Sequence, residues 1–154
     1  MSPITQPLLD SYLGKHIDKI CPSHYKANNH CAHFVSHVLD LSFGYQCGSR
    51  ANVRVHEVFA KCPSVEELLE CRGAYGTGLL FVTGEKNVHL AQQSMENVPK
   101  KHIGIVYGAF VWHYSNTKHQ VVKEIVDQFI FHYKHQQNGL WLGGIPVGAE
   151  AHEF

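Results

Sequence analysis

The chain has 154 residues, of which 44% are hydrophobic and 17% are charged, so its composition is that of a globular protein and excludes a disordered one. Thirteen basic residues balance thirteen acidic residues, which gives no electrostatic reason to expect nucleic acid or an anionic membrane as a partner. The length suits one domain with its own core, and we expect a single domain over residues 1–154.

Targeting signals are missing from the printed sequence. No apolar run approaches the ~20 residues that span a bilayer, and the N-terminal stretch lacks the basic region and apolar stretch of a secretion signal. We therefore expect a protein made in the cytoplasm without membrane insertion. Thirteen histidines would gain positive charge as the pH falls through roughly 6.5, so the fold is expected to be sensitive to acid.

Helices are predicted in the first half of the chain. Three stretches carry apolar side chains near helical spacing: 7–20, 30–41 and 53–62. A fourth helix is predicted after them, because Ser64 and Glu67 have the spacing of a capping box and Gly73 is a natural stop.

Strands are predicted in the second half. The run "GTGLLFVTG" predicts a buried strand at 78–83, and "KKHIGIVYGAFVWHYSN" predicts a hairpin with strands at 101–107 and 110–116. A strand beginning in "HQVVKEIV", a helix in "IVDQFIFHYKH" and a short strand in "GLWLGGIPVG" follow. Helices followed by antiparallel strands indicate an α+β fold.

Five cysteines are present: Cys21, Cys31, Cys47, Cys62 and Cys71. No pair has C-x-x-C spacing, so a zinc ribbon and a thioredoxin-type motif are both poorly supported. In a reducing compartment we expect free thiols that are mostly buried as small apolar groups. A disulfide stays open for a protein that acts outside the cell.

Cys31 stands at the start of a predicted helix in "NHCAHFVSHVL", with Asn28 or Asn29 as the cap. On a helical wheel it shares the packing face with Phe34 and Val35. A helix N-terminus favours a thiolate, lowers the cysteine pKa and offers N–H groups to an oxyanion. An activated nucleophile and a plain core cysteine are both compatible with this stretch.

His33 and His37 lie four residues apart on the opposite face of the same helix, a spacing that metal sites also use. No third ligand is evident in the sequence, and the H-E-x-x-H glutamate is missing. We therefore predict a solvated polar face at these two histidines rather than a metal site.

The hairpin offers a base for Cys31. If residues 108 and 109 form a two-residue turn, Gly104 pairs with His113, and His102 and His113 become diagonal neighbours on one face. Gly104 would leave room for another group to approach. Taken singly, either histidine is compatible with an ordinary strand position; together with Cys31 they have the composition of a Cys-His-His triad.

The sequence resembles the NlpC-type cell-wall cysteine peptidases and the related CHAP amidases of the papain-like superfamily, over roughly residues 25–120. The resemblance lies in the order of "NHCAHFVSHVL", "GLLFVT", "HIGIVYG" and "VWHYSN". Family members commonly have D-C-S-G around the nucleophile, where this chain has "HCAH", and a glycine where it has Lys101. The resemblance implies N-terminal helices packed on a central antiparallel sheet.

The resemblance further implies a cysteine peptidase or amidase that hydrolyses amide bonds in peptidoglycan stem peptides. Cys31 would be the nucleophile, His102 the base and His113 the group that orients His102, with no cofactor. Small members without a wall-binding module resemble phage lysins or secreted effectors. An effector would act in the periplasm or cell wall and would have an immunity protein as inhibitor.

Other functions stay open on the sequence alone. The same triad would serve a thiol acyltransferase or an isopeptidase with a non-wall substrate. A catalytically inactive relative, or a metal-binding domain that uses the many histidines, belongs to a different class.

Overall fold

The structure is a computed structural model that describes residues 4–21, 30–45, 52–134 and 138–153. Its helices are α1 (Gln6–Asp10), α2 (Ile17–Ile20), α3 (His30–Leu39), α4 (Val55–Lys61), α5 (Val126–Lys134) and α6 (Ala149–His152). Its strands are β1 (Val65–Glu67), β2 (Thr77–Gly84), β3 (Val88–His89), β4 (Ser94–Met95), β5 (Lys101–Tyr107), β6 (Phe110–Ser115), β7 (Gln120–Ile125) and β8 (Asn138–Gly143).

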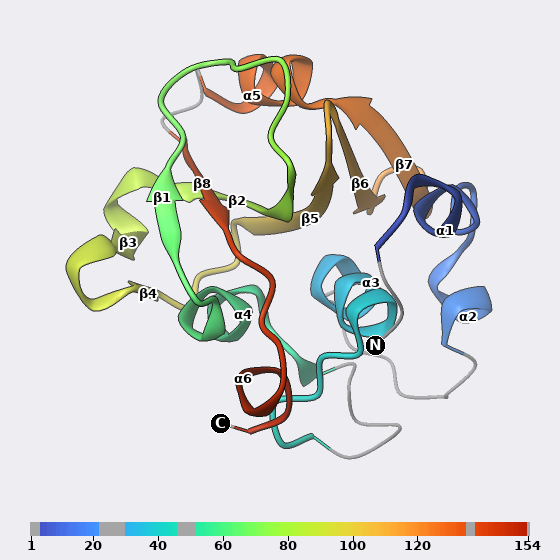
Figure 1. The fold of residues 1–154 in the computed structure, drawn as a ribbon, viewed down its shortest axis with the longest axis horizontal. Helices are drawn as coiled ribbons and strands as arrows, with labels where there is room; N and C mark the ends of the chain where they lie inside the picture. The colour runs from blue at the N-terminus through green and yellow to red at the C-terminus, as the bar shows by residue number, and fades with distance from the viewer. Residues whose placement is uncertain (1–3, 22–29, 46–51, 135–137, 154) are drawn as a thin grey trace.

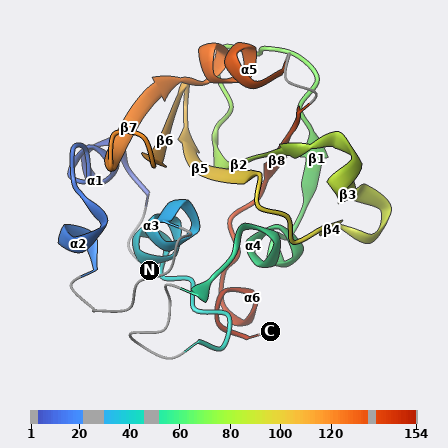
Figure 2. The ribbon, with the colours of Figure 1, turned by 180° about the vertical axis from the view of Figure 1, so that it is seen from behind.

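Six of these strands form one antiparallel sheet in the order β1-β8-β2-β5-β6-β7, and β3 pairs with β4 in a small separate ribbon. The helix α5 lies on one side of the large sheet, and α3 and α4 lie on the other side (Figure 1). The view from behind shows the same three layers (Figure 2).

Each face of the sheet has its own apolar core. On the side of α3 and α4, the alternate residues Ile103 and Ile105 of β5 join a cluster that includes Phe34 and Phe59. On the side of α5, Val106 joins a second cluster with residues of β2, β6, β8 and α5. Burial on both faces explains why β2 is an almost continuous apolar run rather than an alternating one.

The α+β fold predicted from the sequence is confirmed in its coarse form: N-terminal helices pack on a six-stranded antiparallel sheet, and α3 contacts β5 and β6. The helix predicted at 30–41 is α3, and it ends where Asp40 adopts a positive φ of 54°. The helix predicted at 53–62 is α4, and the predicted strands at 78–83, 101–107 and 110–116 are β2, β5 and β6.

The single helix predicted over residues 7–20 is wrong. The chain forms two short helices, α1 and α2, and Gly14 between them has a φ of 78°. The Gly14 N–H donates to the carbonyl of Val121, and the Val121 N–H donates to the carbonyl of Lys15. Backbone pairing with the outer strand β7 therefore replaces the middle of the predicted helix.

The helix predicted from the capping-box spacing of Ser64 and Glu67 is also wrong. Residues Val65–Glu67 form β1, which pairs with β8, and the Gly144 N–H donates to the carbonyl of Ser64. A free strand edge on β8 accepts this short segment, so tertiary pairing overrides a local signal of about 1 kcal/mol.

Among the described residues, the structure has no helix that is both long and apolar enough to cross a bilayer.

Candidate active site

Cys31 lies in the first turn of α3, against the sheet. Its side chain is 3% exposed and belongs to the core cluster on the α3 face. The neighbouring ring of His30 contacts the ring of Tyr114 edge to face at 5.3 Å, which places the start of α3 against β6. The proposed cap residues Asn28 and Asn29 lie outside the described residues.

Burial opposes activation of the Cys31 thiol, which the sequence left open between an activated nucleophile and a core cysteine. Burial raises the pKa of the Cys31 thiol to about 11, although backbone hydrogen bonds at Ile103, at Ala32 and at Cys31 itself act in the opposite direction, as does the charge of Lys101. The helix N-terminus therefore favours the thiolate as predicted, but removal of the sulfur from water is the larger effect. At neutral pH Cys31 is a thiol.

The predicted turn geometry of the hairpin is confirmed. Tyr107 pairs with Phe110 across residues 108 and 109, and Ile105 pairs with Trp112. A Cβ on Gly104 would lie 3.1 Å from the Cβ of His113, so the absence of a side chain at residue 104 admits the neighbouring histidine.

His102 and His113 meet in a direct contact. The His102 Nε2 and His113 Nδ1 atoms are 2.8 Å apart, within hydrogen-bond distance. On the α5 side, the His102 ring stacks on Phe129 at 6.3 Å and lies 6.5 Å from the ring of Tyr133. Burial and the charge of His113 lower the pKa of His102 to about 3, so this imidazole is neutral at physiological pH.

Glu124 on β7 completes a chain of polar side chains. The Glu124 Oε2 atom lies 3.3 Å from His113 Nε2, which is close enough for an ion pair. The angle between the two groups does not meet the geometry of a hydrogen bond. The interaction with His113 lowers the pKa of Glu124, so the carboxylate is ionised and favours the proton of His113 on Nε2. In that tautomer His113 Nδ1 accepts from His102 Nε2–H, and His102 Nδ1 is the basic nitrogen.

A pocket of about 440 Å³ opens over this histidine pair. Both imidazoles line it, together with Lys101, Tyr133 and Asn138. Two of these lining residues, Lys101 and Tyr133, interact electrostatically with Cys31. The charge of Lys101 lowers the pKa of Cys31. Burial and the charge of Glu124 raise the pKa of Tyr133, and a Cys31 thiolate would raise it further.

The structure thus brings the imidazoles of His102 and His113 together, and the Cys31 thiol of α3 lies at the residue that follows His102 on β5. Cys31 is next to the backbone of Ile103, whereas the rings of His102 and His113 contact Phe129 on the α5 face. The resting pair is a core thiol on one side of β5 and a neutral imidazole on the other side. The Cys-His-His triad stays a prediction.

Two features escaped the sequence analysis. Glu124 belongs to no recognisable sequence motif. Its carboxylate comes beside His113 only through the β6–β7 register, in which Val111 pairs with Glu124 and His113 pairs with Val122. The solvated face predicted for His33 and His37 is wrong, because His33 is 3% exposed and His37 is half-buried. Cys21 from α2 lies beside them.

The remaining cysteines fit the sequence prediction in part. Cys21 and Cys62 are buried free thiols, Cys71 is an exposed free thiol, and Cys47 lies outside the described residues.

No protein-family model matches the chain, and no curated protein matches it at a significant level, so the likeness to cell-wall cysteine peptidases rests on the short motifs around Cys31, His102 and His113 alone.

Proposed function

We propose that the protein is a thiol-dependent amide hydrolase of the papain-like, NlpC type that acts on peptidoglycan stem peptides, with Cys31 as nucleophile, His102 as base and His113 as the residue that positions His102. The observation that carries the proposal is the 2.8 Å contact between His102 and His113 on the wall of a polar pocket, together with a helix-start thiol at the backbone of Ile103, the residue that follows His102. The order of these residues along the chain is the order in the family that the sequence resembles.

The protonation states favour a concerted first step. With a neutral thiol and a neutral imidazole at rest, the proton moves as the sulfur attacks and not before. The sulfur forms a bond to the carbonyl carbon, and the thiol proton passes to Nδ1 of His102 once a rotation of the Cys31 and His102 side chains past the start of β5 has brought the two groups together. The positive charge on His102 is shared with His113, which faces Glu124.

The second half of the reaction returns the proton. His102 gives it to the leaving amine as the C–N bond breaks and a thioester remains on Cys31. Water, deprotonated by His102, then hydrolyses the thioester to a carboxylic acid and restores the thiol. Backbone N–H groups at the start of α3 would stabilise the oxyanion in both halves.

The substrate class agrees with the character of the pocket. Lys100, Lys101, Ser115 and Asn138 supply donors along its wall, which suits a short peptide with free carboxylates. The carbonyl would enter between Lys101 and Tyr133, the two walls that interact electrostatically with Cys31.

The test compares digestion of purified peptidoglycan by the wild type and by two cysteine variants. The wild type should release stem fragments detectable by mass spectrometry, and Cys31→Ala should lose about 10³-fold or more of that activity. Cys62→Ala is the matched control, because Cys62 is a buried thiol of the same core cluster and should stay within a few-fold of the wild type.

His102→Ala should be as inactive as Cys31→Ala while circular dichroism shows a folded protein. Full activity of either variant, or no fragment release by the wild type, would refute the proposal. Products in which the stem carbonyl is joined to a new amine would assign the site to acyl transfer instead of hydrolysis.

A further inference from the structure

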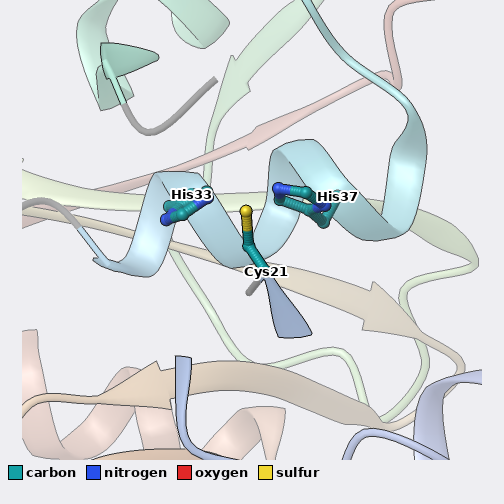
Figure 3. A group of neighbouring side chains, drawn as sticks. All are labelled: Cys21, His33 and His37. Atoms are coloured by element: carbon teal, nitrogen blue, oxygen red, sulfur yellow. The ribbon is translucent and has the colours of Figure 1, made fainter. Parts of the chain in front are cut away.

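A second cluster of reactive side chains lies between the end of α2 and the helix α3. Cys21 follows α2, and His33 and His37 lie one turn apart on α3; the thiol and the two imidazoles offer ligand atoms that all lie within 4.8 Å of one another. The sulfur of Cys21 points between the two rings (Figure 3). The proposed hydrolase chemistry uses none of these residues.

Burial makes the arrangement costly without a ligand. Cys21 is 8% exposed and His33 is 3% exposed, and the Nε2 atom of His33 has no hydrogen-bond partner. An imidazole nitrogen that leaves water without a new partner costs free energy on the order of 1–3 kcal/mol. Buried polar groups without a hydrogen-bond partner are rare in native proteins, so the state of this nitrogen is evidence for a bound ligand.

The donor set identifies the ligand class. One thiol and two imidazoles form an N2S set without a carboxylate, which suits Zn²⁺ and disfavours Mg²⁺ and Ca²⁺. Donor atoms around a tetrahedral zinc ion lie about 3.3–3.6 Å apart, so small rotations of the three side chains close the triangle. His33 and His37 are at i and i+4, the spacing that puts two ligands on one helix face.

We propose that Cys21, His33 and His37 form a Zn²⁺ site that fastens α2 to α3, with a water molecule in the fourth position. Binding replaces the thiol proton of Cys21, which is released to solvent, by a Zn–S bond, and each imidazole gives a nitrogen lone pair. The rings of His33 and His37, whose centroids are 4.9 Å apart, need no change of helix geometry.

The ion would act on the structure of α3 rather than on a reaction. It would connect the segment before α3 to its second and third turns, just after the turn that carries Cys31. Because a preformed site rarely exists in the unfolded chain, the binding free energy adds to the stability of the fold.

The test uses the full chain after treatment with a chelator. Metal analysis and titration should give about one Zn²⁺ per chain, and zinc should raise the thermal midpoint of the wild type. Co²⁺, used as the probe, should show a near-ultraviolet sulfur-to-metal charge-transfer band. Cys21→Ser should lose the band, whereas Cys31→Ala and Cys62→Ala should keep it.

The half-buried ligand gives a variant that is expected to fold. His37→Gln should weaken zinc affinity on the order of 100-fold, more than removal of an outer partner does. Substoichiometric zinc, or a charge-transfer band that persists in Cys21→Ser or disappears in Cys31→Ala, would overturn the site. Neither result bears on peptidoglycan hydrolysis, so the two proposals fail independently.

Discussion

At the scale of single residues, the carboxylate of Glu124 favours one tautomer of His113 and, through it, one basic nitrogen of His102. An ionised carboxylate 3.3 Å from His113 Nε2 favours a proton on that nitrogen, and the 2.8 Å contact passes the preference on to His102. The effect is modest in size, since the Glu124 side chain is 44% exposed and solvent screens its charge.

We therefore predict that Glu124→Gln loosens the tautomer preference of His113. A neutral amide can donate as well as accept, so the Nδ1–H form of His113 should become populated, and turnover should fall by a few-fold. Long-range ¹⁵N–¹H NMR spectra of the imidazoles report the tautomers directly. Glu66→Gln is the matched control, because Glu66 pairs with Arg72 at 3.1 Å in an exposed position. An unchanged His113 spectrum in Glu124→Gln would remove the carboxylate from the relay.

At the scale of elements, the β5–β6 hairpin was predictable because its signal is local. The glycine at 108, with a φ of 65°, permits the two-residue turn, and alternation then fixes which side chains share a face. The position of β1 was not predictable, because it depends on the edge of β8, more than seventy residues later in the chain.

We predict that Gly104→Ala damages this hairpin. The new methyl group would lie 2.7 Å from Val111 Cγ2 and 3.1 Å from the Cβ of His113, so β5 and β6 must separate or His113 must move. The expected loss of stability is about 1–3 kcal/mol, measured by urea unfolding.

The matched control for that variant is Gly144→Ala. Its Cβ would meet atoms of Pro63 and Ser64 at 3.5 Å and beyond, which is ordinary contact, and the expected change is within about 0.5 kcal/mol. Equal stability losses in the two variants would show that close approach at residue 104 is unimportant.

The candidate site also combines features that local sequence predicts with features that depend on distant parts of the chain. The pair His102 and His113 follows from strand register, so the sequence predicts it well. The pKa of Cys31 depends on how deeply the whole fold buries the sulfur, and Cys21 reaches His33 only through the packing of α2 on α3. Properties set by neighbours distant in the chain, such as burial and a third ligand, leave no trace in local spacing.

At the scale of the whole molecule, burial of neutral histidine links stability to pH. His102 has its pKa lowered to about 3 by burial and by His113, while an unfolded histidine titrates near about 6.5. The unfolded chain therefore binds a proton that the folded chain refuses, and stability is lost as the pH falls from about 6.5 toward 3. The titratable groups near the His102 ring are His113, Tyr133 and, on the other side of His113, Glu124.

We predict that His102→Gln flattens this acid dependence. The difference in unfolding free energy between pH 7 and pH 5 should shrink relative to the wild type, even if the variant is less stable at pH 7. The exposed substitution His89→Gln should keep the wild-type slope. Urea unfolding at several pH values gives the slopes, and parallel slopes for His102→Gln and the wild type would contradict the prediction.

The outer strands of the sheet have a consequence for behaviour at high concentration. β1 is three residues long and carries two exposed glutamates, and part of β7 is already paired with the backbone of Gly14 and Lys15. Edge strands that are short, charged or already paired resist edge-to-edge pairing with the sheets of other molecules. The chain should thus resist assembly into fibres under conditions in which a protein with a long unpaired edge strand would aggregate.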